Sequence, residues 1–388
     1  MAKEVPLRIQ VRLPRVELHR QPLPQTCPQA DCEGTHFKAH GTRGEIKPLR
    51  DLEHTQVRAY RYRCLRCGHT FRVYPRGVSR ASQSDRLKAL SVLMYVLGLS
   101  YGAVADVLTA LGLPIAKSTV YANVQEAGRA SRRHQQADSR ASKTRAVIGA
   151  DATYLKLRGE QVTVGMVVDD RTEELLGLEL LPSENTDDLT DFVREIAEAV
   201  GAEVLVSDDL DSYKGVADEL GLGHQICRSH VRRNAEQLGA QLKAQAARQR
   251  EAPEGVRSSP ERLREDVETL QALVRERPSR GEALLERMYG RYQGAAPPKP
   301  NRRASVWYRM RMWVTRLWEG WRRLTLDQRR KDLDGTNNTA ERVIGWWLKE
   351  RYRSMRGYKR EASIRNVVTL TARMGARSGA YDMAELYA

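Results

Sequence analysis

The chain has 388 residues, with 65 Lys and Arg against 49 Asp and Glu, and a formal net charge of +16. This length predicts two or three domains. The longest apolar run, Ala89 to Leu99, is about half of the ~20 residues that cross a bilayer, and the N-terminus lacks the features of a secretory signal. We therefore expect a cytosolic protein with no membrane partner, whose excess positive charge favours a polyanion such as nucleic acid.

Four of the five cysteines form two close pairs near the N-terminus, Cys27-x4-Cys32 and Cys64-x2-Cys67. Paired cysteines in a reducing compartment are more typical of metal ligands than of disulfides. Four thiolates can close a tetrahedral site around Zn²⁺, and Gly68 permits the tight turn that the second pair needs. The sequence thus predicts an N-terminal arm and a zinc ribbon over residues 1–80, with structural Zn²⁺. Four free thiols are the alternative.

The next segment, residues 81–130, has the apolar spacing of three short helices separated by tight turns. Ala103–Leu111 and Ser118–Ala127 would form a helix-turn-helix, whose second helix enters the DNA major groove. Ser118 is the candidate N-cap, and Lys117 would meet a phosphate. The outward residues of the first turns, and so the candidate base contacts, are Thr119, Tyr121 and Asn123, and Ser118 counts with them among the DNA-binding residues. An ordinary three-helix bundle would have the same pattern.

Residues 131–144 are polar and predict a linker. Beyond it come three runs typical of strands, then a helix, a strand, a helix and a short strand. This order is typical of a mixed α/β sheet. We assign it to residues 145–230 and 331–388, with an all-helical insertion over residues 231–330.

Three acidic residues stand where they could share one edge of this sheet. Asp151 ends a predicted buried strand, Asp208 follows another, and Glu341 begins a helix whose first turn Asn337 or Asn338 can cap. Neighbouring strands would bring both aspartates to the same end of the sheet. Buried together, the acids would repel one another unless cations neutralise them. Two Mg²⁺ or Mn²⁺ ions would do so, and would support phosphoryl transfer. Any one of these acids alone would be an ordinary turn residue.

The blocks IGADATYLKL, VLVSDDLDSY, QICRSHVRRN and TNNTAERVIGWW, in this order, resemble the DDE transposases of bacterial insertion sequences, especially the branch related to Mutator-type elements. The resemblance implies a ribonuclease-H-like catalytic fold in which Asp151, Asp208 and Glu341 bind two divalent metals. It also implies a bacterial or archaeal protein that is associated with the nucleoid when bound to DNA.

Two features of these blocks bear on the site. Asp209 directly follows Asp208 and could replace it, although the spacing to Tyr213 favours Asp208. Cys227 and His230 match the C-x2-H motif of the resembled branch, and their spacing places both on one face of a helix. They could organise the active site, or be an ordinary buried thiol beside a solvated histidine.

The insertion and the segment after it are rich in arginine, which predicts surfaces for the DNA backbone. Aromatic and aliphatic residues at helical spacing, such as Trp313, Leu317 and Trp321, predict core contacts, whereas Trp307 or Trp318 could be exposed and stack on an unpaired base. The candidate backbone contacts are Arg309, Arg316, Arg351, Arg353 and Arg356.

Together these patterns predict a transposase that binds the terminal inverted repeats of a mobile element and cuts and joins double-stranded DNA, both transposon ends and target. Because two ends must be paired, we expect a homo-oligomer, at least a dimer. A non-catalytic or domesticated DNA-binding regulator, or a structure-specific nuclease of the same fold, would share this architecture.

Overall fold

The computed structural model describes residues 10–18, 21–41, 44–141, 147–353, 355, 357–376 and 380–387. The chain divides into two compact units. The first comprises residues 1–137, 155–162 and 342–388, and the second residues 138–154 and 163–341. None of the described helices is both long and apolar enough to cross a membrane.

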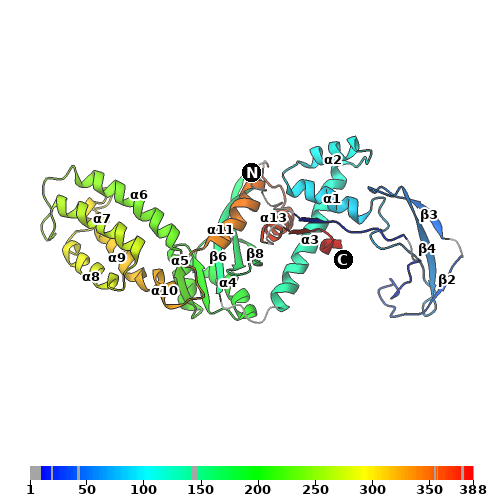
Figure 1. Cartoon of the computed structure of the whole chain (residues 1–388), viewed down its shortest axis with the longest axis horizontal. Coiled ribbons are helices and arrows are strands. Elements are labelled where there is room, and N and C mark those ends of the chain that lie inside the picture. Colours follow the sequence, from blue (N-terminus) through cyan, green and yellow to red (C-terminus); the bar gives the residue numbers. More distant parts are fainter. Residues whose placement is uncertain are drawn as a thin grey trace, which may run out of the picture. The chain divides into compact units, whose positions relative to one another are not determined.

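The first unit contains a small antiparallel sheet (Figure 1). Strand β4 pairs with β2, β3 and β5, and a separate parallel pair joins β1 to β11 near the two ends of the chain. The strands are β1 (Gln10–Arg12), β2 (Phe37–Ala39), β3 (Glu45–Pro48), β4 (Gln56–Cys64), β5 (Thr70–Val73) and β11 (Ala380–Asp382).

Helices complete the first unit. Ser84 and Ser100 cap the first two helices, since their hydroxyl oxygens accept from the N–H groups of Leu87 and Ala103. The helices are α1 (Asp85–Val96), α2 (Tyr101–Ala110), α3 (Lys117–Ala141), η1 (Val343–Lys349), α12 (Glu350–Arg353), α13 (Glu361–Ala376) and η2 (Glu385–Tyr387).

Two sequence expectations about this unit change. The three helices predicted over residues 81–130 are present, but the third continues to Ala141, so the predicted linker over 131–144 is helical over most of its length. The C-terminal segment, which the sequence places with the α/β sheet, packs in the first unit from Arg342 onward. There α13 lies against α3, where Tyr121 shares a hydrogen bond of 2.9 Å with Ser363.

The second unit is built on a five-stranded sheet with the order β10-β9-β6-β7-β8. The strands are β6 (Val147–Leu157), β7 (Glu160–Asp169), β8 (Leu175–Leu181), β9 (Val204–Ser207) and β10 (Gly223–Ile226). Arg158 and Gly159, both with positive φ, form the two-residue turn of the β6–β7 hairpin. β7 and β8 are antiparallel, whereas β6, β9 and β10 run parallel. The sequence predicts a mixed α/β sheet, and this strand order, with antiparallel β7 beside parallel β6, β9 and β10, is the ribonuclease-H-like one that the resemblance implies.

Helices α4 (Thr186–Val200) and α5 (Asp211–Glu219) connect the later strands and help to bury the sheet. Their apolar faces share one core with β6 and β9, in which Ile148, Val193 and Leu205 are fully buried. The polar faces of both helices remain toward solvent, as expected for helices that cover a sheet.

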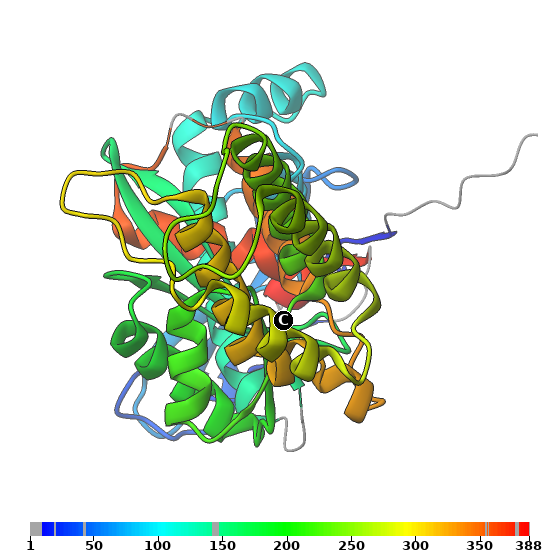
Figure 2. The same ribbon diagram turned by 90° about the vertical axis from the view of Figure 1, so that its left-hand side faces the viewer.

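The predicted helical insertion has a core of its own. Figures 1 and 2 show α6 to α9 lying side by side as one bundle, coloured green to gold. Trp313, Leu317 and Trp321 are buried in this core, as their spacing predicts, and Trp307 is buried with them at 2% exposure. The helices are α6 (Arg228–Ala246), α7 (Pro260–Glu276), α8 (Gly281–Tyr292), α9 (Val306–Leu324), the short α10 (Leu326–Arg329) and α11 (Asn338–Arg342), which leads out of the insertion.

The contact of α3 with α13 leaves no room for a side chain at Gly128. A Cβ atom there would lie 2.6 Å from the carbonyl oxygen of Asn366. We expect Gly128→Val to lower the free energy of unfolding of this unit by about 1–3 kcal/mol, because the helices must move apart. Urea titration followed by circular dichroism measures the change. Ala122→Val, at an exposed position of the same helix, is the control and should cost less than 1 kcal/mol, about what a β-branched residue costs in a helix. Equal stabilities of the two variants would contradict the close packing.

Candidate active site and metal centre

The register of two neighbouring strands brings Asp151 and Asp208 to the same edge of the sheet. β6 and β9 are parallel, with Val147 opposite Val204 and Gly149 opposite Val206. The same register, continued by two residues, places Asp151 level with Asp208, which directly follows β9. The sequence expectation that these strands lie side by side is therefore confirmed. Asp151 itself lies in the middle of β6, which continues to Leu157, so the expectation that it ends a strand is wrong.

Asn337 joins three elements at this edge. Its side-chain Nδ2 donates to the carbonyl oxygen of Ala150 over 2.9 Å, directly before Asp151. Its backbone N–H donates to Cys227 Sγ over 3.2 Å, and its carbonyl oxygen accepts from the N–H of Glu341 over 3.1 Å. Asn337 is fully buried. The sequence offers Asn337 or Asn338 as a cap of α11, but the side chain of Asn337 is bonded to β6 instead.

Gly149, next to Ala150 on β6, lets the side chain of Asn337 approach closely. A Cβ atom on Gly149 would lie 3.0 Å from Asn337 Oδ1. A second hydrogen bond, 3.2 Å from Thr339 Oγ1 to the carbonyl oxygen of Asp170, ties α11 to the end of β7. These contacts hold the start of α11, the helix that carries Glu341, beside β6 and the end of β7.

The electrostatics of the edge are unfavourable for three ionised acids. Burial raises the pKa of Asp151 to about 7; the N–H of Ala152, which donates to its carboxylate, opposes this shift, and the charges of Asp208 and Glu341 add to it. Burial also raises the pKa of Asp208, against a hydrogen bond from the N–H of Leu210. His230 and, at Asp208, Arg316 lower these pKa values in part, but burial remains the largest effect on both aspartates, and bound cations would relieve it.

Asp209 has a different environment from Asp208. Lys214 Nζ and Arg316 Nε lie 2.8 Å and 2.7 Å from its carboxylate oxygens, so its charge is already paired. Arg316, which the sequence marks for DNA, is therefore engaged by an acid of its own chain. These contacts favour Asp208 over Asp209 as the acid available to a metal.

Cys227 and His230 lie at the start of α6, beside Glu341. His230 Nδ1 is 3.4 Å from Glu341 Oε1. A pocket of about 370 Å³ opens next to them. Its walls include Asp208, His230, Asn234, Trp313 and Arg316.

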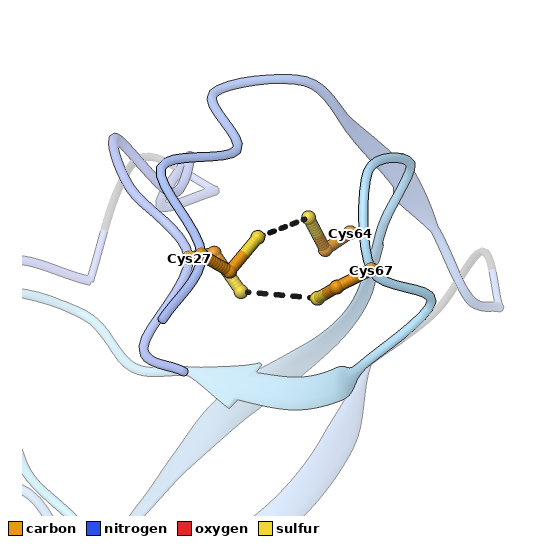
Figure 3. Close-up of side chains that lie close together, drawn as sticks. Cys27, Cys64 and Cys67 are labelled. Carbon is orange, nitrogen blue, oxygen red and sulfur yellow. Dashed lines mark hydrogen bonds between the residues drawn. The ribbon is translucent and has the colours of Figure 1, made fainter. Parts of the chain in front are cut away.

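The four N-terminal cysteines form a second centre, drawn in Figure 3. Cys27 Sγ lies 3.7 Å from Cys67 Sγ, and Cys32 Sγ lies 3.8 Å from Cys64 Sγ. All four sulfur atoms are within 4.8 Å of one another. Four thiolates around one Zn²⁺, at Zn–S distances of about 2.3 Å, would have sulfur atoms about 3.8 Å apart. The cluster therefore fits a tetrahedral metal ion.

Backbone geometry supports this cluster. Gly68 has φ +75°, as the sequence predicts for the turn after the second pair. The N–H of Cys67 lowers the pKa of Cys64 to about 7, although burial opposes the shift. Gly34 is a residue that the sequence analysis did not identify: a Cβ atom there would lie 2.6 Å from Cys64 Sγ.

The candidate base contacts on α3 need correction. The helix begins at Lys117, so Ser118 lies inside it and is not its N-cap. Lys117 and Ser118 are exposed, and Thr119 and Tyr121 are half-buried. Asn123 does not face outward, because it is 2% exposed and its amide is bonded to Gln83 and Ser91. Burial removes it from the residues that could contact DNA.

The arginines that the sequence assigns to the DNA backbone have different environments. Arg351 is 5% exposed, its guanidinium lies 4.0 Å from the centre of the Tyr95 ring, and it donates to the carbonyl oxygen of Leu99. It is a packing residue, so its assignment to a DNA surface is wrong. Arg309 donates to two glutamines of α6, and Arg353 is exposed and pairs with Glu350. Arg356 lies outside the described residues.

The raised pKa of Asp151 predicts a pH-dependent stability for the metal-free protein. Between about pH 4 and pH 7 the folded protein binds more protons than the unfolded chain, so its stability falls as the pH rises through this window. We expect Asp151→Asn to raise the melting temperature by several degrees at pH 8 and to have little effect at pH 4. Thermal unfolding of both proteins in a chelator measures the difference. The same difference at both pH values would contradict the burial of this carboxylate.

Comparison with known proteins places the chain in a family. The family model described as the IS66 family of transposases matches residues 81–352, which is more than half of the chain. Two similar solved structures are the catalytic core of HTLV-2 integrase in complex with magnesium and the catalytic core of BIV integrase.

The two integrase similarities are weak. The first has 10% identity and a TM-score of 0.20, and covers 34% of this chain and 85% of that one. The second has 11% identity and a TM-score of 0.19, and covers 54% and 97%. These TM-scores are too low to bear on the fold, which rests on the strand order of the sheet. No curated protein matches.

The family match corrects one expectation, since it is to IS66 and not to the Mutator-related branch that the motif blocks resemble. The transposase expectation itself is confirmed, and with it an action on DNA. The chain belongs to the IS66 family of DDE transposases.

Proposed function

We propose that this transposase cleaves DNA at the ends of its mobile element and joins them to target DNA, with Asp151, Asp208 and Glu341 holding two Mg²⁺ or Mn²⁺ ions. The observation that carries the proposal is the parallel register of β6 and β9, which puts two acids from distant parts of the chain level at one sheet edge. Glu341 joins them through the contacts of Asn337.

The three acids do not converge on one point, and a site with two ions does not require them to do so. Among the described residues, the groups whose metal-binding atoms all lie within 4.8 Å of one another do not include this acidic trio. Two ions ~4 Å apart need carboxylates on both sides of the pair, and hence wider spacing than a single ion does. Such a pair supplies an activated water or 3′-hydroxyl and stabilises the leaving oxygen.

The surroundings of Asp151 and Asp208 favour the binding of these ions. Burial keeps Asp151 partly protonated near neutral pH, so it gives up its proton to bind a metal. Lys214 and Arg316 keep the neighbouring Asp209 paired and leave Asp208 available. The pocket beside Asp208 has room for a phosphate of the DNA end, but its wall holds Asp208 and Asp209 beside Arg316, so the phosphate would bind there through metal ions on the acids.

We further propose that the first unit recognises the terminal repeats. The exposed Lys117 and Ser118 stand at the beginning of α3, where a recognition helix would meet DNA. Zn²⁺ held by Cys27, Cys32, Cys64 and Cys67 would stabilise the small sheet, whose own buried core is small. Pairing of two element ends calls for a homo-oligomer, at least a dimer.

Substitution of each acid tests the catalytic proposal. With a labelled element end and Mg²⁺, we expect Asp151→Asn, Asp208→Asn and Glu341→Gln each to lower the rate of strand cleavage by at least a thousandfold, while binding of the end changes less than threefold. Asp209→Asn is the matched control and should keep its rate within about tenfold. Gel assays of cleavage and of end binding give both values.

The outcomes separate the alternatives. An active Asp208→Asn with an inactive Asp209→Asn would overturn the choice of the second acid. Unchanged cleavage in all three variants would overturn the site. A pre-cut end that is never joined to target DNA would point to a nuclease, and end binding without any cleavage by the unmodified protein would point to a regulator.

A further inference from the structure

Three side chains of different chemistry converge beside the acidic edge. Cys227 directly precedes α6 and His230 is its third residue, so both lie on one side of the helix start. Glu341 reaches them from α11. Cys227 Sγ, a ring nitrogen of His230 and a carboxylate oxygen of Glu341 all lie within 4.8 Å of one another.

Two of these atoms lack the partners that buried polar atoms need. His230 Nδ1 and Glu341 Oε1 are both buried, and neither has a hydrogen-bond partner among the described residues. The two atoms face each other and form an ion pair only if His230 is protonated; with a neutral ring both stay unsatisfied, which is costly, and a bound cation between them would satisfy both. Their separation of 3.4 Å equals the spacing of a nitrogen and an oxygen ligand on one tetrahedral ion, since Zn–N and Zn–O distances of about 2.0–2.2 Å place such ligands roughly 3.4 Å apart.

The third ligand atom, Cys227 Sγ, also has the surroundings of a metal ligand. Cys227 is fully buried, and the backbone N–H of Asn337 donates to its sulfur over 3.2 Å. The thiolate ligands of zinc knuckles accept the same kind of hydrogen bond, as Cys64 does from Cys67 in the N-terminal cluster. A thiolate, an imidazole and a carboxylate suit Zn²⁺, whereas Mg²⁺ prefers oxygen ligands alone.

We propose that Cys227, His230 and Glu341 bind one thiophilic divalent cation, Zn²⁺ or a similar ion, in addition to the ion of the four-cysteine cluster. Three protein ligands leave a fourth position for water or substrate. The pocket lined by His230 and Asp208 adjoins this position. The inference concerns metal binding alone, so it stands or falls separately from the proposed catalytic role of Glu341.

The number of tightly bound ions tests the proposal. The full-length protein is first stripped of metal with a chelator. One sample is then titrated with Zn²⁺ and another with Co²⁺, whose thiolate complexes absorb in the near ultraviolet. We expect Cys227→Ser and Glu341→Gln each to bind one ion fewer than the unmodified protein, or to bind it at least tenfold more weakly. His230→Gln should do the same. His54→Gln, at a half-buried histidine of the first unit, is the matched control and should lose none.

Two further measurements keep the result decisive. Cys64→Ser removes the ion of the four-cysteine cluster. The Co²⁺ absorption that remains in this variant belongs to the second site, and it should disappear in the double variant Cys64→Ser/Cys227→Ser. Circular dichroism shows whether each variant is folded. If Cys227→Ser proves unstable, Glu341→Gln, which preserves the size of the side chain, serves as the test. The proposal is overturned if the folded Cys227→Ser and Glu341→Gln variants bind as many ions, as tightly, as the unmodified protein.

Discussion

Two acids 57 positions apart in the sequence share one edge of the sheet because β6 and β9 run parallel as neighbours. The rest of the site is arranged around this pairing. Asn337 extends it to a third element, since its side chain is bonded to β6 while its backbone reaches Cys227 and Glu341. The helical insertion leaves the sheet after β10 and returns just before Asn337, so about a hundred residues can intervene without disturbing the edge.

The same edge concentrates negative charge where water is scarce. Burial opposes ionisation of Asp151 and Asp208, and the charges of Asp208 and Glu341 raise the pKa of Asp151 further. A protein would not keep this arrangement for its stability alone, because apolar side chains would pack there at lower cost. The charge is consistent with a site whose stability is completed by cations. Asp209 shows the alternative, since Lys214 and Arg316 pair it within the chain itself.

Much of the second unit could be predicted from the sequence. The strands from Val147 to Ile226 and the helices between them follow from their apolar periodicity. The spacing of the two cysteine pairs predicts the N-terminal cluster. The role of Asn337 could not be predicted, because a polar residue before a helix looks like a cap whether its side chain turns inward or outward. Gly34 and Gly149 were missed for a similar reason: only the packed structure shows the sulfur that excludes a Cβ atom at Gly34 and the amide that crowds one at Gly149.

Surface assignments were the least predictable. Asn123 and Arg351 carry polar groups that sequence reasoning assigns to DNA, yet each is buried by a partner distant in the sequence, Gln83 in one case and the Tyr95 ring in the other. The extension of α3 to Ala141 was hidden because a polar helix and a polar linker have the same composition. Such choices depend on tertiary contacts, which no local pattern records.

The most direct measurement of the central claim is the location of bound ions. Crystals of the protein with a DNA end and Mn²⁺, measured at a wavelength where manganese scatters anomalously, would show where the ions lie. The account predicts two peaks ~4 Å apart, each within ligand distance of a carboxylate oxygen of Asp151, Asp208 or Glu341. Peaks elsewhere, with these three carboxylates free of metal in a cleavage-competent complex, would contradict it.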